Sequence, residues 1–238
     1  LKKEFGVESR RAALRQVVRQ ECNSAILKVA ERIRADIEDR RENRLEICPD
    51  GKELIEIDPG QVMDLWEMAC PKDREPDLNP PLICVAWRNK TALELNISVR
   101  ARLHGQENGM QPVQARDYLM IVSNNYKTGL WNGELALVQS AAIQNEIRTV
   151  GIRSKEGLKR IELAFRQVTL AVPCGGGSVS TITCMILENV LFGRERDLTE
   201  DEQIALWVDF KNRHPELRPH TDEFKLALAA DPYFHALR

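Results

Sequence analysis

The sequence predicts a mixed α/β fold: a partial parallel sheet with helices, an inserted small antiparallel β-barrel, and C-terminal helices. Residues 81–87 form a short, almost purely apolar run that is typical of a strand buried on both faces, and a helical pattern follows it. From about residue 114 the pattern changes to short strands separated by glycine turns. Beyond residue 196 it is helical again, so we expect three parts: residues 1–113, 114–196 and 197–238.

The composition is that of a soluble globular chain. Of the 238 residues, 43% are hydrophobic and 29% are charged, which excludes wholesale disorder. The longest uncharged run, residues 167–187, contains a proline and three glycines and therefore indicates strands and a turn rather than a membrane span. No apolar stretch follows the charged first residues, so we expect no signal peptide and no membrane partner. The six cysteines are scattered without metal-ligand spacing, which argues against a zinc site and favours a cytoplasmic protein.

The net charge of −2 is unevenly distributed along the chain. Residues 1–44 and 81–172 carry net charges of +4 and +5, whereas residues 45–80 and 173–238 carry −7 and −4. Two basic segments could form one surface for a polyanion, although solvated charged helices explain the same pattern.

The N-terminal part is expected to be mostly helical. Apolar residues recur at helical spacing over residues 9–42, and residues 23–24 either interrupt this helix or cap a second one. Residues 54–57 alternate between apolar and polar beside an Asp-Gly turn, which is typical of a short strand. The Pro-Gly pair at residues 59–60 opens a short helix, and residues 71–81, with four prolines, predict a loop.

The remaining elements follow from turn and cap signals. A helix over residues 91–104 should end at Gly105. The antiparallel unit after it, a small barrel or sandwich, should have a turn at Asn132-Gly133. Its expected strands lie at residues 118–122, 134–138, 147–152, 160–172 and 180–187. Two helices then start at Thr199, which forms a capping box with Glu202, and at Thr221.

No self-contained active site is visible in the sequence. The only Gly-Lys pair, at residues 51–52, does not belong to a phosphate loop, and the glycine-rich residues 174–178 fit a turn between strands. The sequence has no Gly-x-Ser-x-Gly elbow, and no arrangement of neighbouring groups singles out one of its four histidines.

Three segments, taken in order, resemble superfamily 1 DNA helicases of the RecD-like type. The first is Leu14-Arg-Gln-Val-Val-Arg-Gln20, followed by Ile-Leu-x-x-Ala-x-x-Ile-Arg at residues 26–34. The second is Leu82-Ile-Cys-Val-Ala-Trp-Arg-Asn-Lys90, which is similar to a strand that ends in Thr-Asn-Lys, although Trp-Arg replaces the family's small residue and Thr. The third, residues 119–134, is similar to the Asn-x-x-x-Gly-Leu-x-Asn-Gly-Asp element that opens an inserted SH3-like barrel, with Glu134 in place of Asp.

The resemblance implies an internal fragment of a larger protein. Residues 1–113 would be part of the second RecA-like motor domain, residues 114–196 its inserted SH3-like barrel, and residues 197–238 a helical segment leading back to it. The family's Walker A, Walker B and Thr-x-His-Lys-x-Gln-Gly motifs are not in this sequence. The parent would therefore bind ATP and Mg²⁺, whereas the isolated fragment would bind no cofactor and hydrolyse no ATP. The implied partners are single-stranded DNA, along which the parent would move 5′ to 3′, and the remaining helicase domains of the same chain.

The first segment would contribute to the nucleotide site. The resemblance places Arg19 opposite the γ-phosphate of ATP as a catalytic arginine, with Gln20 beside it as a nucleotide-binding residue. The alternative for Arg19 is an ordinary solvent-exposed helix arginine.

The other two segments would contact DNA. Arg88, Asn89 and Lys90 would hold backbone phosphates at the end of a strand, or else Asn89 satisfies backbone groups where a helix starts. Asn125 and Trp131 would add contacts from the hairpin; Trp131 would stack on a base or else pack into the barrel core. The rival to a helicase fragment is a non-enzymatic nucleic-acid-binding or protein-interaction module centred on the barrel.

Overall fold

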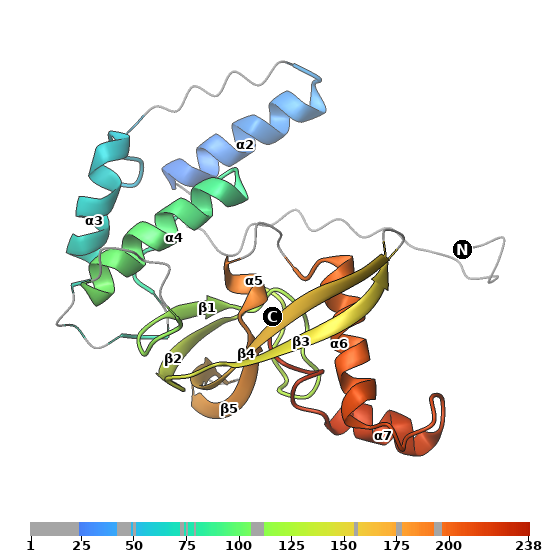
Figure 1. Ribbon diagram of the computed structural model, residues 1–238. Coiled ribbons are helices and arrows are strands. Elements are labelled where there is room, and N and C mark those ends of the chain that lie inside the picture. Colours follow the sequence, from blue (N-terminus) through green and yellow to red (C-terminus); the bar gives the residue numbers. More distant parts are fainter. Residues whose placement is uncertain are drawn as a thin grey trace. The chain divides into compact units, whose positions relative to one another are not determined.

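The computed structural model describes residues 24–41, 49, 51–71, 74, 76–78, 80–105, 112–154, 157–174, 178–192 and 197–238. The chain divides into two compact units, Leu1–Val62 and Met63–Arg238, and we describe each by itself. Figure 1 shows the helices and strands of both units. Among the described helices, none is long and apolar enough to cross a membrane.

The described part of the first unit begins with α2 (Ala25–Glu38), drawn in blue in Figure 1. Ser24 is its N-cap residue, and the Glu53 carboxylate accepts a hydrogen bond from the Ala25 N–H at 2.5 Å. The N-terminal helical prediction is therefore confirmed over Ala25–Glu38, with Ser24 as the residue that precedes the helix. Residues 9–23, which include Arg19 and Gln20, lie outside the described ranges.

The short strand expected at residues 54–57 is not formed. These residues have no regular structure because no strand in the described part of this unit pairs with them. The 3₁₀ helix η1 (Pro59–Gln61) follows, and Asp58 forms a capping box with Gln61. It continues into α3 (Val62–Ala69), which confirms the short helix predicted from the Pro-Gly pair.

The buried strand expected at residues 81–87 is also not formed. Residues 82–86 have no regular structure, and Val85 and Trp87 are 93% and 98% exposed. An apolar run becomes a strand only where neighbouring strands complete its backbone hydrogen bonds, and no described strand pairs with this one. The described residues therefore contain no parallel sheet, contrary to that part of the sequence prediction.

The helix after this segment is confirmed. It is α4 (Asn89–His104), and it ends at Gly105, whose φ of 64° lies in the left-handed region that glycine adopts without a Cβ clash. Arg88 precedes the helix in an extended conformation, so the three basic and amide residues 88–90 form the helix start.

The antiparallel unit is confirmed as a single five-stranded sheet. Its strand order is β1-β2-β4-β3, and β5 lies off this path and also pairs with β4. The strands are β1 (Tyr118–Met120), β2 (Leu135–Ala141), β3 (Glu146–Ser154), β4 (Gly157–Pro173) and β5 (Val179–Leu187). All their pairings are antiparallel, and they do not close the sheet into a barrel.

The long strand β4 organises this sheet and separates two apolar cores. Its first half pairs with β3, and its second half lies between β2 and β5. Leu163 and Phe165 belong to one core, whereas Val168 and Leu170 belong to the other. Odd and even residues of a strand point to opposite faces, so the buried face changes halfway along β4.

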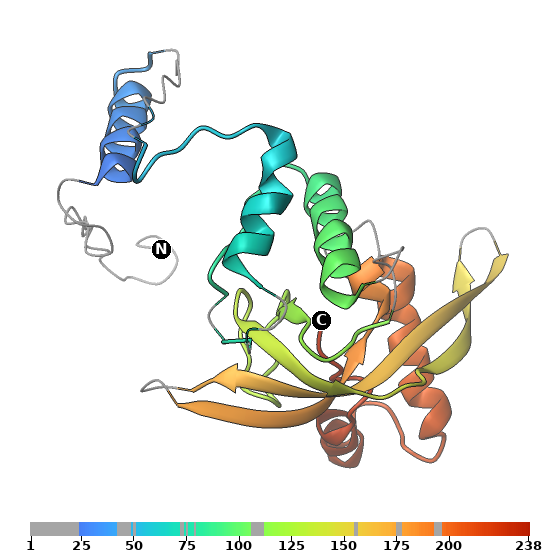
Figure 2. The ribbon, with the colours of Figure 1, turned by 90° about the vertical axis from the view of Figure 1, so that its left-hand side faces the viewer.

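Three helices complete the second unit: α5 (Asn189–Phe192), α6 (Glu200–Arg213) and α7 (Asp222–Ala230). Figure 2 shows α6 along the β3–β4 side of the sheet, where its Ala205 and Leu206 join the core of Phe165. The predicted caps are confirmed, because Thr199 shares a capping box with Glu202 and the Thr221 hydroxyl accepts from a backbone N–H.

The C-terminal residues link two distant edges of the sheet. Leu237 forms a parallel bridge with Ile186, in which its N–H donates to the Met185 carbonyl at 2.8 Å. The next carbonyl, that of Arg238, accepts from the Val122 N–H at 2.9 Å. The chain therefore passes between the end of β5 and the residues that follow β1.

Candidate nucleic-acid interface

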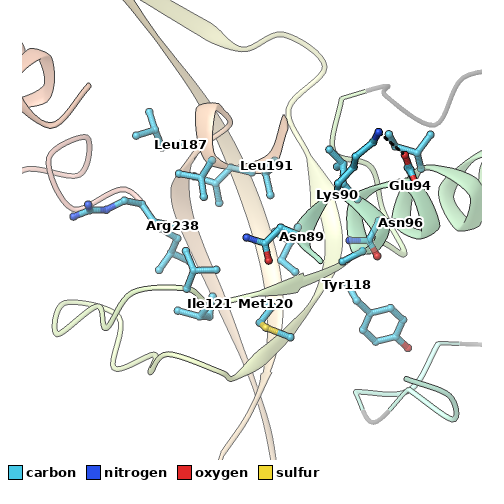
Figure 3. Close-up of a pocket in the computed structure, with 18 residues that line it drawn as sticks. Asn89, Lys90, Glu94, Asn96, Tyr118, Met120, Ile121, Leu187, Leu191 and Arg238 are labelled. Carbon is cyan, nitrogen blue, oxygen red and sulfur yellow. Dashed lines mark ion pairs between the residues drawn. The ribbon is translucent and has the colours of Figure 1, made fainter. Parts of the chain in front are cut away.

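The start of α4 lies at the rim of a cavity of about 770 Å³. The cavity is formed by the N-terminal half of α4, by residues 118–122, and by the end of β5 with α5, as Figure 3 shows. Its wall is mainly apolar, and its polar lining side chains include Asn89, Lys90, Glu94, Asn96 and Arg238. This size and this combination are typical of sites that enclose a small molecule or a segment of a larger one.

The electrostatics of the α4 start favour an anion. Arg88 makes no side-chain hydrogen bond to cap the helix, and no acidic residue lies in the first turn. The partial positive charge of the helix N-terminus therefore adds to the charges of Arg88 and Lys90. The Lys90 ammonium reaches Glu94 at 3.8 Å, an exposed pair that opposes phosphate binding only weakly.

Buried polar contacts fix the position of α4 over the sheet. Asp117, 4% exposed, accepts hydrogen bonds from the Nε and Nη2 of Arg100, both at 2.9 Å. His104 Nε2 lies 3.0 Å from the same carboxylate, and the Gln114 N–H donates to it at 2.9 Å. Since Asp117 immediately precedes β1, these bonds position the helix against the strand that lines the cavity.

Tyr118 is a second anchor of this region. Its hydroxyl donates to the carbonyl of Asp77 in the proline-rich loop, and its ring lines the cavity. Burial, with the nearby Cys70 and Asp77, raises the pKa of the Tyr118 phenol, so the hydroxyl remains a donor at neutral pH.

The structure gives Asn125 a role inside its own loop. The residue is 8% exposed, and its Nδ2 donates to the His235 carbonyl at 2.8 Å. Its Oδ1 accepts from the N–H groups of Lys127 and Thr128 at 3.1 and 3.0 Å. Because these bonds already use the amide, Asn125 orders the loop rather than presenting its side chain to DNA.

Trp131 is accessible rather than buried in the core. It is 46% exposed, and its ring meets the ring of Tyr126, 82% exposed, at an angle of 83° with centroids 5.6 Å apart. The buried residue of this turn is instead Leu130, which belongs to the core of Val168. The alternative in which Trp131 packs into the barrel core is therefore wrong.

An ionic network holds the C-terminal turn that leads to Arg238. Both Nη atoms of Arg213 bind the carboxylate of Asp231, which is 5% exposed and also accepts the N–H groups of Tyr233 and Phe234. Burial alone raises the pKa of the Asp231 carboxyl, but the hydrogen bonds from Arg213 and Phe234 outweigh it and hold the pKa below its usual value.

The network continues onto β3 through Arg148. Its guanidinium binds Glu146 at 2.6 Å and Asp209 at 3.0 Å, and it lies 3.7 Å from the ring centre of Tyr233. The Tyr233 hydroxyl donates to Glu146 at 2.8 Å. Burial raises the pKa of the Glu146 carboxyl, but the hydrogen bonds of Arg148 and Tyr233 lower it further than burial raises it. The same hydrogen bond to Glu146, followed by burial, raises the pKa of Tyr233.

The structure places the predicted site residues on two elements. Arg88, Asn89 and Lys90 form the start of α4 rather than the end of a strand, and Trp131 lies on a different element, the loop between β1 and β2. Tyr126 was missed, although an aromatic residue between a predicted strand and a predicted turn is a signal that could have identified it. Arg238 at the cavity has no such signal, because only the fold brings its carbonyl to the Val122 N–H.

Neither chemistry nor similarity assigns an activity to these residues directly. No group of three or more histidine, cysteine or acidic residues that could hold a metal ion occurs in the described part of the chain. No protein-family model matches the sequence, and no curated protein matches it either.

Proposed function

We propose that this chain is the part of an ATP-dependent DNA helicase or translocase that contacts single-stranded DNA. The observation that carries the proposal is that two of the RecD-like segments lie at accessible features of the second unit, a helix start and an exposed loop. Residues 88–90 start a helix at a cavity, and residues 124–133 form an exposed loop between two paired strands. These are the positions at which the resemblance expects DNA-binding residues. The first turn of α4 contains no acidic residue, which also supports an anionic ligand.

The exposed run at residues 82–87 supports the motor-domain part of the proposal. Ile83, Val85 and Trp87 are 63%, 93% and 98% exposed. Three large apolar side chains at every second position are rarely all exposed. In a RecA-like domain this run would be an inner parallel strand, and strands from the remaining helicase domains of the parent would cover it.

The C-terminal bridge supports the inserted barrel. Leu237 and Arg238 connect the end of β5 with Val122, which follows β1, so the backbone hydrogen bonds join the two edges that a barrel must bring together. We propose that this bridge is the closure of an SH3-like barrel of residues 114–196, completed by the residues that return to the motor domain.

ATP chemistry would depend on the parent protein. The sequence holds no phosphate loop, and only Arg19 and Gln20, outside the described ranges, are assigned to the nucleotide site. In the parent, Arg19 would stabilise charge that develops on the γ-phosphate of Mg²⁺-bound ATP. The isolated chain is expected to bind single-stranded DNA without hydrolysing ATP.

The test is DNA binding by the whole chain, measured as fluorescence anisotropy of a labelled oligothymidylate. We expect the affinity of the Arg88→Ala, Lys90→Ala double variant to fall, and its dependence on salt to become weaker, because two phosphate contacts are removed. Arg218→Ala, Lys225→Ala is the matched control, since it removes one exposed arginine and one exposed lysine from other positions. An equal loss of affinity in both double variants would mean that the α4 start contributes only nonspecific charge. Absence of DNA binding by the wild type would reject the proposal.

A non-enzymatic nucleic-acid or protein-interaction module is the second candidate. The exposed aromatic pair Tyr126–Trp131 favours it, because exposed rings of this kind can bind a ligand without any ATP-driven domain. ATP turnover by a longer natural protein that contains this sequence would separate the two candidates.

A further inference from the structure

We propose that Tyr126 and Trp131 together form a rigid stacking platform for an unpaired nucleobase, flanked by Lys127 and Asn132. The inference deepens the proposed function and rests on it: it names the loop, the second ring and the chemical group recognised. We call residues 123–133 the aromatic loop.

The two rings expose more apolar surface than the loop needs for its own folding. Tyr126 and Trp131 are 82% and 46% exposed, yet they contact each other edge to face at 5.6 Å. Leu130 already provides the anchor to the core, with 4% exposure. A perpendicular pair leaves a free ring face that a flat, aromatic ligand can cover.

The loop holds the rings in place before any ligand arrives. The Asn125 N–H donates to the Leu130 carbonyl at 2.8 Å, and the Gly129 N–H donates back to the Asn125 carbonyl at 2.9 Å. Gly129 and Gly133 have φ values of 70° and 93°, which let the backbone turn tightly on both sides of Trp131.

Further bonds fix the Trp131 side of the loop. The Trp131 N–H donates to the Glu134 carboxylate at 2.8 Å, and the Asn132 N–H donates to Asn124 Oδ1 at 2.9 Å. A loop backbone fixed by these bonds loses little conformational entropy on binding, which makes stacking on its two rings more favourable.

The charge and polarity of the aromatic loop match single-stranded nucleic acid. Residues 123–133 contain one cation, Lys127, and no aspartate or glutamate. The Lys127 ammonium donates to the Ala230 carbonyl at 2.5 Å, a neutral partner that does not cancel its positive charge. Asn132 lies at the exposed tip, where an amide can bond a base edge. Stacking on the rings with a lysine beside the phosphates is the usual way to bind unpaired strands.

A proline-rich peptide is the other ligand that packs on exposed aromatic rings. Such peptides occupy an aromatic-lined groove, whereas this pair is a single corner and the described cavity is lined by other residues. We therefore commit to the nucleobase and include the peptide as an outcome of the test.

The experiment measures the affinity of the full 238-residue chain for an oligothymidylate of about 20 nucleotides and for an abasic strand of the same length. Tyr126→Ala and Trp131→Ala should each weaken oligothymidylate binding by about tenfold, because stacking on an aromatic ring is worth about 1–3 kcal/mol per base. Trp131→Phe should recover part of the loss. The abasic strand should bind the wild type and the variants equally.

Leu158→Ala is the matched control, since Leu158 is 75% exposed on the β3–β4 hairpin and should not affect binding. Melting temperatures within a few degrees of the wild type would show that the loop variants fold. The stacking proposal alone fails if both variants bind oligothymidylate like the wild type while the Arg88, Lys90 double variant is weakened. It also fails if the variants lose abasic binding equally, or if a polyproline peptide quenches Trp131 fluorescence and oligothymidylate does not. The proposed function fails, and the stacking proposal with it, if the wild type binds neither strand.

Discussion

Two neighbouring regions of the second unit contrast in how they are stabilised. The β unit, residues 112–238 as far as the structure describes them, buries two apolar cores and ties its C-terminal turn with an ionic network. The segment 82–90 exposes Val85 and Trp87 almost completely, and the ion pair of Lys90 with Glu94 is on the surface. The contrast indicates that the β unit folds on its own contacts, whereas residues 82–90 leave apolar side chains exposed, which is why we propose that other parts of the parent protein cover them.

The largest difference should appear when one aromatic residue is removed from each region. Phe165 is fully buried between β3, β5 and Tyr233, so Phe165→Ala should lower the free energy of unfolding by about 3–5 kcal/mol. Trp87→Ala should change it by less than about 0.5 kcal/mol, because the ring is 98% exposed. Urea denaturation followed by circular dichroism measures both. A similar loss for both variants would mean that residues 82–90 pack against the unit in solution.

The loss of an ion pair should also cost more stability in the β unit than in the segment 82–90. Arg166 and Glu188 are 2% and 6% exposed, with Nε and Oε1 2.5 Å apart, and Asn145 donates to the same carboxylate. Glu188→Ala leaves the Arg166 guanidinium buried without a carboxylate and should cost about 3–5 kcal/mol of stability.

Glu94→Ala is the control for the exposed pair. It removes the partner of Lys90 at 3.8 Å and should cost less than about 0.5 kcal/mol. The same variant should strengthen binding of single strands, because it frees Lys90 for a phosphate. Equal destabilisation by Glu94→Ala and Glu188→Ala would contradict the distinction between the regions.

Local signals explain why the sequence predicts most of the β unit. The Asn132-Gly133 turn, the Thr199 and Thr221 caps and the Gly105 helix end each act within a few residues, so their consequences can be derived without knowing the fold. All five strands were therefore located close to their observed bounds.

Long-range pairing explains what the sequence could not predict. Residues 82–87 have the composition of an inner strand, but strand formation needs a partner that composition does not provide. The change of buried face within β4 also depends on what packs against each half, which is α6 beside Phe165 and β2 beside Leu170. Arg238 reaches the cavity only through the bridge of Leu237 to β5.

Thiol reactivity gives a smaller contrast between the regions. Burial raises the pKa of the Cys184 thiol in β5 from 9.0 to about 11, whereas Cys84 is exposed in the segment 82–90. Since the thiolate is the reactive form, Cys184 should be about 100-fold less reactive than an ordinary thiol near pH 8. Timed alkylation followed by peptide mass spectrometry should find Cys84 labelled first. Labelling of both at the same rate would show that β5 opens readily.

The smallest expected effect is the acid sensitivity of the ionic network. The pKa of Asp231 lies below its ordinary value of 3.8 in the folded chain, because the Arg213 and Phe234 hydrogen bonds outweigh the opposing effect of burial. A lowered folded pKa contributes stability that is complete above the unfolded pKa and is lost as the pH falls through the folded pKa. The free energy of unfolding should therefore decline below about pH 4, with Glu146 adding to the decline from its own ordinary value of 4.5.

Asp231→Asn tests the origin of that decline. The amide keeps the shape of the side chain but cannot carry the charge that binds Arg213, so the variant should lose about 1–3 kcal/mol at neutral pH. Between pH 5 and pH 3 the free energy of unfolding of this variant should fall less than that of the wild type, because the Asp231 carboxylate is no longer there to be protonated. Asp222→Asn is the matched control, because Asp222 is an exposed aspartate whose ion pair with nearby Lys225, at 3.1 Å, lies on the surface. If Asp231→Asn and Asp222→Asn show the same acid profile as the wild type, the network does not hold the C-terminal turn. The bridge of Leu237 and Arg238 would then depend on backbone pairing alone.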